Sequence, residues 1–309
     1  MCANYRGITL LSLPGKVYSK MLERRVRLIV EPRIEEEQCG FRPGRGTTDQ
    51  LFTLSRIKEG AWEYAHPVYM CFVDLEKAYD QVRREKLWEV LREYGVRGSL
   101  LGAIQSLYAQ SESCVRVLGS KSKAFPVGVG LRLGCALSPI LFVVFMDRIS
   151  RRSRGEESLQ FGGLRISSLL FASVCDLQLS LERFAVECEA VGMRISTSKS
   201  EAMVLSRKPM DCLLQVGMCP YPQVKEFKYL GVLFTSEGKM ECEFGRRIGA
   251  AGAVFHSLYR TVVTKRELSR KAKLSIYRSI FVPTLTYGYE GWVMTERTKE
   301  WLASLLGVG

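Results

Sequence analysis

The feature that most constrains the fold of this chain is a short apolar run that ends at a lone carboxylate. Segment 68–73 reads Val-Tyr-Met-Cys-Phe-Val and leads to Asp74, after which charged residues recur at helical spacing. β-Branched and aromatic residues in so short a run are typical of a buried strand. A carboxylate at the end of a strand suits a hard cation such as Mg²⁺, because its oxygen ligands must converge from a rigid backbone. An aspartate that caps a helix beginning near Glu76 fits the same residues equally well.

The charge of the chain indicates its partners. In 309 residues, 47% of them hydrophobic, 45 Lys and Arg oppose 32 Asp and Glu, for a formal net charge of +13. Such an excess on a globular chain favours a polyanion. The basic residues gather in four clusters, each of which alone is typical of a solvated helix face. The clusters are Arg24, Arg25 and Arg27; Arg151, Arg152 and Arg154; Arg246 and Arg247; and Lys265, Arg266, Arg270, Lys271 and Lys273. Four clusters together favour nucleic acid.

The cysteines and apolar runs exclude other classes of protein. Ten cysteines include no C-x-x-C pair and only two histidines are present, so a zinc site is improbable. Several cysteines lie in apolar runs, as free thiols do in a reducing compartment. The longest apolar stretch, 136–146, is too short to span a bilayer, and 8–13 is too short for a signal-peptide core. We expect an intracellular protein, in the cytoplasm or nucleus, without a membrane partner.

Hydrophobic periodicity and breaker residues predict alternating helices and strands. We expect helices after Pro14 up to Pro32, at 84–95, 99–108, 140–149 and 176–191, and from 241 onward, and strands at 68–74, 114–118, 164–172, 193–196, 202–205 and 229–234. Two glycine-rich turns, 38–50 and 128–139, each open a helix. The first has the features of an anion site at a helix N-terminus, although a plain turn is the commoner explanation for such a segment and it is not a Walker A loop.

Seven segments, taken in order, resemble the reverse transcriptases of non-LTR (LINE-type) retrotransposons. Each block alone is only suggestive, but their common order is highly specific and covers nearly the whole chain. The blocks are Asn-Tyr-Arg-Gly-Ile-Thr-Leu-Leu from Asn4, Gln-Cys-Gly-Phe-Arg-Pro-Gly-Arg-Gly-Thr from Gln38, Phe-Val-Asp-Leu-Glu-Lys-Ala-Tyr-Asp from Phe72, Gly-Cys-Ala-Leu-Ser-Pro from Gly134, Leu-Leu-Phe-Ala from Leu169, Lys-Ser-Glu from Lys199 and Phe-Lys-Tyr-Leu-Gly from Phe227.

The resemblance implies an α+β chain with the right-hand polymerase fold of fingers, an antiparallel-sheet palm and a helical thumb. It places a fingers-like segment at 1–67, a palm with part of the fingers at 68–235, and a truncated, basic, thumb-like helical region at 236–309. The implied reaction is RNA-directed DNA synthesis from deoxynucleotides, on an RNA template with a DNA primer. Two Mg²⁺ ions would stabilise the charge that develops on the attacking and leaving oxygens.

The resemblance also implies roles for single residues. Asp74 would be the first metal ligand, assisted by the backbone carbonyl of Leu75. Lys199 would be the acid near the departing pyrophosphate, although a lysine in a turn is usually only solvated.

Further residues of the resemblance would hold the nucleotide and the template. Arg42 and Arg45 would contact the triphosphate or the template. Tyr79 would lie against the sugar of the incoming nucleotide and exclude a 2′-hydroxyl, although an ordinary packed aromatic is the plainer reading. Arg132 and Gly134 belong to the second glycine-rich turn and complete the nucleotide- and template-binding set.

The sequence departs from the family where the second metal-binding block should stand. The family has Phe-Ala-Asp-Asp, whereas this chain has Phe-Ala-Ser-Val at 171–174. Segment 171–199 is also shorter than the family pattern by roughly one strand of about 5–6 residues, so a deletion explains the loss. Asp176 begins a helix, where capping is its expected role. Asp74 alone cannot hold two Mg²⁺ ions, and Leu133 replaces a glutamine whose hydrogen bonds a leucine cannot supply.

We therefore expect a degenerate copy of a reverse transcriptase domain that is catalytically inactive. We also expect that no endonuclease precedes it and that its likeness to the family fades after Arg297. Two alternatives stay open: a non-catalytic nucleic-acid-binding protein, and a decayed element product without a role. Salt-dependent RNA binding without nucleotide incorporation would favour the first alternative, and the absence of a cooperative unfolding transition would favour the second.

Overall fold

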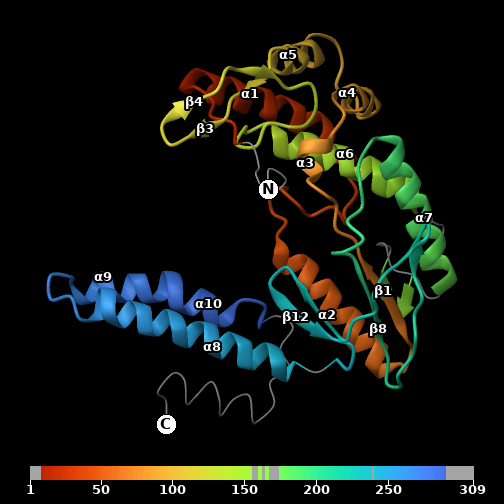
Figure 1. Cartoon of the computed structure of the whole chain (residues 1–309). Helices are drawn as coiled ribbons and strands as arrows, with labels where there is room; N and C mark the ends of the chain where they lie inside the picture. Colours follow the sequence, from red (N-terminus) through yellow and green to blue (C-terminus); the bar gives the residue numbers. More distant parts are fainter. Residues whose placement is uncertain (1–7, 155–158, 162–163, 167–173, 239, 290–309) are drawn as a thin grey trace. The chain divides into compact units, whose positions relative to one another are not determined.

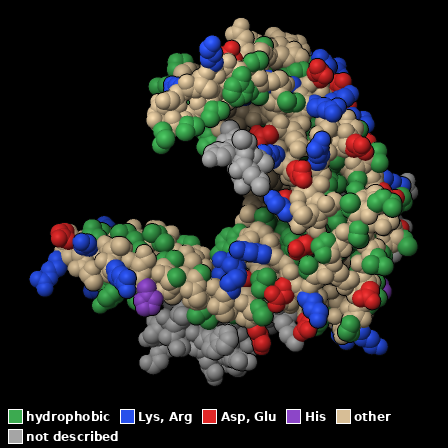
Figure 2. All heavy atoms as spheres, viewed as in Figure 1, with side chains coloured by type: hydrophobic (Ala, Val, Ile, Leu, Met, Phe, Trp, Pro, Cys, Tyr) green, Lys and Arg blue, Asp and Glu red, His purple; other side chains and the backbone are tan. Residues whose placement is uncertain are grey.

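A computed structural model describes residues 8–154, 159–161, 164–166, 174–238 and 240–289. The chain mixes helices with small two-stranded sheets (Figure 1), which is an α+β composition. It divides into two compact units. Unit 1 comprises Met1–Gly46, Tyr69–Ala202 and Cys212–Pro222, and unit 2 comprises Thr47–Val68, Met203–Asp211 and Gln223–Gly309. Lys and Arg side chains are spread among hydrophobic and polar groups over the surface (Figure 2).

Unit 1 contains most of the helices. They are α1 (Leu13–Val30), α3 (Ala78–Gln81), α4 (Arg84–Glu93), α5 (Gly98–Ala109), α6 (Ser138–Ser153) and α7 (Val174–Ala190), with a 3₁₀ turn at Glu31–Arg33. Its strands are β1 (Val68–Phe72, apart from its first residue), β2 (Glu112–Ser113), β3 (Arg116–Val117), β4 (Ser120–Lys121), β5 (Phe125–Pro126), β6 (Leu159–Phe161), β7 (Leu164–Ile166), β9 (Gln215–Val216) and β10 (Cys219–Pro220). The pairs β2–β5, β3–β4, β6–β7 and β9–β10 are antiparallel. β1 pairs with β8 (Glu201–Leu205), the first two residues of which also belong to unit 1.

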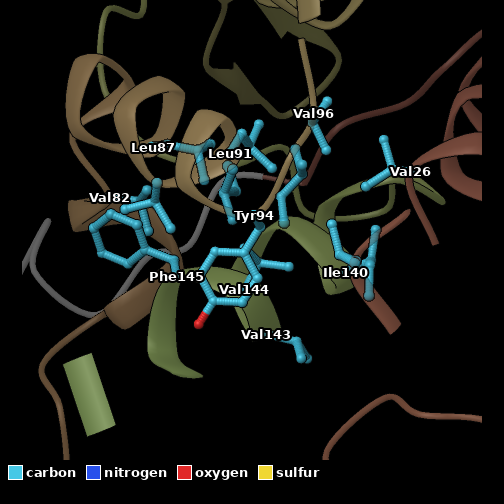
Figure 3. Packing of buried hydrophobic residues seen from close by; sticks show 14 of the residues in the cluster. Val26, Val82, Leu87, Leu91, Tyr94, Val96, Ile140, Val143, Val144 and Phe145 are labelled. Atoms are coloured by element: carbon cyan, nitrogen blue, oxygen red, sulfur yellow. The ribbon is translucent and has the colours of Figure 1, made fainter. Parts of the chain in front are cut away.

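The core of unit 1 lies between α4, α6 and α1. Leu87 and Leu91 of α4 point toward Val144 and Phe145 of α6, and Val26 of α1 is completely buried in the same cluster (Figure 3). Apolar side chains at intervals of three and four residues place one face of each helix in this core. Burial of these side chains is the main source of stability for the unit.

A buried carboxylate joins three segments of this unit. Asp147, in α6, is 1% exposed and accepts hydrogen bonds from the Tyr94 hydroxyl at 2.5 Å, the Glu35 backbone N–H at 2.9 Å and Arg151 Nε at 2.9 Å. Burial of the Tyr94 phenol, reinforced by its hydrogen bond to Asp147, raises the pKa of Tyr94. Because both oxygens of the buried carboxylate accept hydrogen bonds, it fixes α6 against the end of α4 and the chain that follows α1.

Unit 2 contains one long helix, a β-hairpin and a helical hairpin. The elements are α2 (Thr47–Glu63), β11 (Glu226–Tyr229), β12 (Val232–Thr235), α8 (Glu241–Leu258), α9 (Arg270–Ile276) and α10 (Val282–Thr286), with π-helical turns at Tyr259–Val263 and Tyr277–Phe281. The helices α8 and α10 lie side by side (Figure 1), around a small core of Ala251, Phe281 and Leu285.

Three predicted strands need correction. Segment 229–234 is not one strand, because Leu230 and Gly231, with φ angles of 46° and 86°, form the turn of the β11–β12 hairpin. Segment 114–118 contains only β3, and segment 193–196 contributes only an isolated bridge between Ile195 and Leu75. The end of the predicted strand 164–172 lies outside the described residues.

The compartment of the protein stays a prediction. The cysteines that the structure describes are all free thiols. Among the helices of the described ranges, none has the length and apolar character needed to cross a bilayer.

Candidate active site

Asp74 follows the end of β1 and has a fixed backbone. Its N–H donates to Ser200 Oγ at 3.0 Å, and its carbonyl accepts from the N–H of Ser196 at 2.8 Å. The next residue, Leu75, forms an antiparallel bridge with Ile195. The chain at 74–76 is thus held against 194–196, so that the carboxylate of Asp74 projects from rigid backbone.

Lys199 is the second predicted catalytic residue that the structure brings to this place. Its Nζ lies 3.9 Å from Asp74 Oδ2, and the two side chains are 71% and 49% exposed. At this distance and exposure the ion pair contributes little to stability. Both groups are therefore accessible to a ligand.

The donor set that the described residues provide at Asp74 does not fit a pair of Mg²⁺ ions. Octahedral Mg²⁺ requires several oxygen ligands in near-ideal geometry. Within the described ranges, no group of three or more Asp, Glu, His or Cys side chains could hold a metal ion. In the sequence, the first carboxylate after Ala172 is Asp176, which lies in the first turn of α7. The described residues therefore assign no metal pair to this site.

Tyr79 lies at the beginning of α3, half-buried against α6. Its ring stacks on Phe142 with centroids 4.3 Å apart and an interplanar angle of 21°. Its carbonyl accepts from the N–H of Leu131 at 2.8 Å, which joins it to the second glycine-rich turn. The structure thus confirms that Tyr79 is packed, and its predicted contact with a sugar stays a prediction.

The ionisation of Tyr79 gives a pH-dependent prediction. Burial, assisted by the charge of Tyr108, raises the pKa of Tyr79 from 10.0 to about 12. A pKa that is higher in the folded protein gives stability that is complete below pH 10 and is lost as the pH rises toward 12. Between pH 10 and pH 12, we expect the free energy of unfolding to fall less for Tyr79→Phe than for the parent. Denaturant titration at each pH measures this free energy. Tyr18→Phe, which changes an exposed tyrosine, is the control, and equal slopes for Tyr79→Phe and the parent would contradict the assignment.

The second glycine-rich turn is built by two close backbone approaches. At Gly130, with φ of +83°, a Cβ atom would lie 2.9 Å from the carbonyl oxygen of Asp80. At Gly134, with φ of +94°, it would lie 2.8 Å from the carbonyl oxygen of Thr9. The Thr9 N–H also donates to the carbonyl of Leu133 at 2.8 Å. Gly134 therefore has a structural reason to be glycine, and its predicted contact with template or nucleotide stays a prediction.

Gly134→Ala is expected to lower the free energy of unfolding by more than about 2 kcal/mol. A left-handed backbone costs a non-glycine residue about 1–2 kcal/mol, and the clash with Thr9 adds to this cost. The matched control is Gly98→Ala, because Gly98 has φ of +59° and open space around the new methyl group. Chemical denaturation of both variants should show the smaller loss for Gly98→Ala; equal losses would mean that the approach of Thr9 carries no energy.

Arg132 is held by the packing around Tyr108. Its Nη2 donates to Ser111 Oγ at 2.9 Å, and its guanidinium carbon lies 5.5 Å from the centroid of the Tyr108 ring. Ser138 Oγ donates to the Arg132 carbonyl at 2.8 Å. These contacts orient Arg132, and its predicted role in nucleotide binding stays a prediction.

Arg42 stabilises the first glycine-rich loop. Its side chain is 9% exposed and donates to Glu31 Oε1 at 2.7 Å and to the carbonyls of Glu35 at 2.6 Å and Gln38 at 3.1 Å. These bonds engage much of the donor capacity of the guanidinium. We infer that Arg42 shapes the loop, and its predicted contact with the triphosphate is untested.

Arg45 and Phe41 are two of the exposed side chains of this loop. Arg45 is 38% exposed and lies 3.9 Å from Glu36. Phe41, which is not among the site residues predicted from the sequence, is 60% exposed and has φ of +55°. An exposed aromatic ring on a strained loop beside an arginine is a candidate for contact with a nucleic-acid base. The only sequence signal was an aromatic residue among the glycines and arginines of the loop.

Comparison with known proteins identifies the class. The family model for reverse transcriptase (RNA-dependent DNA polymerase) matches residues 2–234. The chain therefore belongs to the reverse transcriptase family, and the resemblance to the non-LTR type is confirmed by its relatives.

These relatives are proteins of transposable elements. The chain is 25% identical over 302 residues to the Retrovirus-related Pol polyprotein from type-2 retrotransposable element R2DM of Drosophila melanogaster, covering 91% of this chain and 27% of that protein. It is 25% identical over 313 residues to the RNA-directed DNA polymerase from mobile element jockey of the same species, covering 93% and 33%. To the Transposon TX1 uncharacterized 149 kDa protein of Xenopus laevis it is 27% identical over 247 residues, covering 76% and 19%. The chain thus spans about a third or less of the length of these relatives.

Proposed function

We propose that this chain is a reverse-transcriptase-like domain of a non-LTR retrotransposon that no longer synthesises DNA. The observation that carries the proposed loss of activity is that the described residues contain no cluster of metal-binding side chains at Asp74. The backbone of Asp74 is fixed as a metal ligand requires, but Ser173 and Val174 stand where the family has its two aspartates. A single carboxylate does not provide the ligands for two Mg²⁺ ions.

The parts of the polymerase fold are assigned in the same proposal. Residues 68–235, with the fixed Asp74, form the palm with part of the fingers, and 1–67 form the remainder of the fingers. Residues 236–309 form the thumb. The last boundary is supported by the end of β12 at Thr235 and the start of the helical hairpin at Glu241. The partners in this proposal are an RNA template, a DNA primer and deoxynucleotides.

Primer extension tests the proposal directly. With an RNA template, a DNA primer and either Mg²⁺ or Mn²⁺, we expect no nucleotide incorporation above background. The parent and Asp74→Ala should give the same signal. Incorporation by the parent that Asp74→Ala abolishes would overturn the assignment of an inactive site.

A non-catalytic role in nucleic-acid binding is the second candidate, and the net charge of +13 favours it. When binding depends on phosphate contacts, the logarithm of the binding constant falls linearly with the logarithm of the salt concentration, because each contact releases counterions. We expect a steep loss of RNA affinity between about 50 and 200 mM salt. A flat response would exclude a phosphate-binding surface.

The third reading, a decayed product without a role, makes a different prediction. Such a chain need not unfold cooperatively. A specific fold is indicated instead by two features: the buried carboxylate of Asp147, which is hydrogen-bonded, and the hydrophobic core between α4 and α6. Calorimetry distinguishes the two cases, because a cooperative transition excludes an unfolded remnant.

A further inference from the structure

The β3–β4 hairpin has an unusual residue at its tip. Arg116 pairs with Lys121 and Val117 with Ser120, so Leu118 and Gly119 form a two-residue turn with φ angles of 47° and 87°. Such turns favour Asn-Gly or Gly-Gly, because both central residues need positive φ. Leucine is disfavoured in this conformation, and the side chain of Leu118 is fully exposed, at 101%. No packing within the described residues compensates for its placement.

The whole hairpin is exposed on both faces. Every residue from Cys114 to Pro126 is exposed, including Val115, Val117 and Phe125 at 55%, 59% and 45%. Figure 2 shows hydrophobic side chains over the hairpin region that Figure 1 labels β3 and β4. An isolated two-stranded hairpin is marginally stable in water. Its apolar surface therefore indicates a partner.

The charge of the hairpin identifies the partner as an anion. The sequence has no Asp or Glu from Ser113 to Met146. Arg116, Lys121 and Lys123 form no ion pair within the described part of the chain. Arg116 and Lys121 stand directly opposite one another across the strands, an arrangement that destabilises a hairpin unless their charges are neutralised.

We propose that the β3–β4 hairpin is a nucleic-acid contact, in which Leu118 packs against unpaired bases while Arg116, Lys121 and Lys123 bind the flanking phosphates. An apolar side chain finds its complement on base faces, which are accessible in a single strand or at an opened base step. The deep major groove of an RNA duplex is too narrow to admit such a tip. The inference rests on the proposed retention of nucleic-acid binding and adds the site and the unpaired state of its ligand.

Two variants separate the apolar contact from the charge. Leu118→Asn removes the apolar tip and installs the residue that this turn prefers, so the hairpin is kept. The triple variant Arg116→Gln, Lys121→Gln, Lys123→Gln removes three positive charges. Its matched control is Lys16→Gln, Arg92→Gln, Arg97→Gln, which removes the same charge from exposed positions elsewhere in unit 1. Calorimetry of each full-length variant confirms that it folds.

Binding to a labelled single-stranded RNA and to a blunt RNA duplex of the same length is measured by fluorescence anisotropy over a salt series. We expect Leu118→Asn to weaken single-strand binding about tenfold without changing the salt slope, and to leave duplex binding unchanged. The salt slope is the slope of the logarithm of the binding constant against the logarithm of the salt concentration, and for a single strand each phosphate contact contributes roughly 0.7 to its magnitude. The hairpin triple variant removes three such contacts, so it should reduce the magnitude of the slope by about 2. The control triple variant should change the slope much less.

Different results overturn different parts of the inference. If Leu118→Asn and the parent bind single-stranded RNA equally well, the proposed contact between Leu118 and the bases is refuted. If the two triple variants have equal salt slopes, the proposed phosphate contact is refuted. Loss of self-association in the Leu118→Asn variant, with RNA binding intact, would identify the tip as a protein interface and refute the proposal. Binding by the parent with no effect of any hairpin variant refutes this inference alone. No binding by the parent refutes the proposed nucleic-acid function as well.

Discussion

Glu243→Ala is expected to lower the free energy of unfolding by about 3–5 kcal/mol, the range for removing one partner of a buried ion pair. The Glu243 side chain is 0% exposed, and its carboxylate accepts from Arg247 Nε at 2.6 Å, from Arg246 Nη2 at 2.8 Å and from the Leu233 N–H at 2.8 Å. Both arginines also donate to the carbonyl of Gly231. The carboxylate thus joins α8 to β12, and its loss removes the anion that pairs with Arg247, which is 10% exposed.

Chemical denaturation followed by circular dichroism measures this effect. Glu243→Gln should be intermediate, because the amide oxygen still accepts from Leu233 while the charge is lost. Glu267→Ala is the control, since Glu267 is an exposed glutamate of the same unit, and it should change stability by no more than about 0.5 kcal/mol. Equal stabilities for Glu243→Ala and Glu267→Ala would show that the buried pair is energetically neutral.

The helices of the fold could be predicted from the sequence because their signals are local. The segments predicted at 84–95, 99–108 and 176–191 are α4 (Arg84–Glu93), α5 (Gly98–Ala109) and α7 (Val174–Ala190), within a few residues at each end. Apolar residues at helical spacing fix such elements whatever lies around them.

The hairpins were less predictable, because their turns break the residue preferences on which sequence analysis relies. Leu118 and Leu230 each adopt positive φ before a glycine, where Asn or Gly is the usual signal. The apolar residue made each turn look like a continuation of the strand. The single strand predicted at 229–234 is therefore the second half of the β11–β12 hairpin and its turn, and the strand predicted at 114–118 includes half of the exposed turn of β3–β4.

The candidate site shows the same division between local and long-range information. The strand before Asp74 was readable from its own residues, whereas its proximity to Lys199 depends on the bridge between Leu75 and Ile195. Only the resemblance to the family predicts that Asp74 and Lys199 belong to the same site. The partners of Arg42 could not be predicted either, because two of its acceptors are backbone carbonyls whose direction depends on the loop conformation.

We expect the largest gain of activity from restoring the hairpin that the comparison with the family pattern predicts to be deleted after Ala172. Helix α7 begins at Val174, two residues after Ala172, so the chain has no residues for a turn and a returning strand at this place. A cavity of about 250 Å³ lies beside the end of β1, lined by Cys71 and Val73 on one side and by residues of α7 such as Leu181 and Phe184 on the other. Two aspartates inserted without the strand lack a rigid backbone to direct them, and carboxylates bind Mg²⁺ productively only when they are so directed.

Four proteins compared by primer extension test this expectation: the parent, the parent with two aspartates inserted after Ala172, the parent with the full hairpin, and the full hairpin with Leu133→Gln. We expect activity only in the last two, because the returning strand aims both new carboxylates at the position of Asp74. Leu133→Gln should raise the activity further, since the amide restores hydrogen-bonding capacity beside the nascent base pair. Activity in the aspartates-only protein would refute the claim that a strand is missing.

The control for this experiment is Asp74→Ala in the repaired protein. It should return nucleotide incorporation to background, because metal-dependent nucleotide transfer in the repaired protein requires the carboxylate that follows β1. If none of the four proteins incorporates nucleotides, the loss of the hairpin is not the limiting lesion.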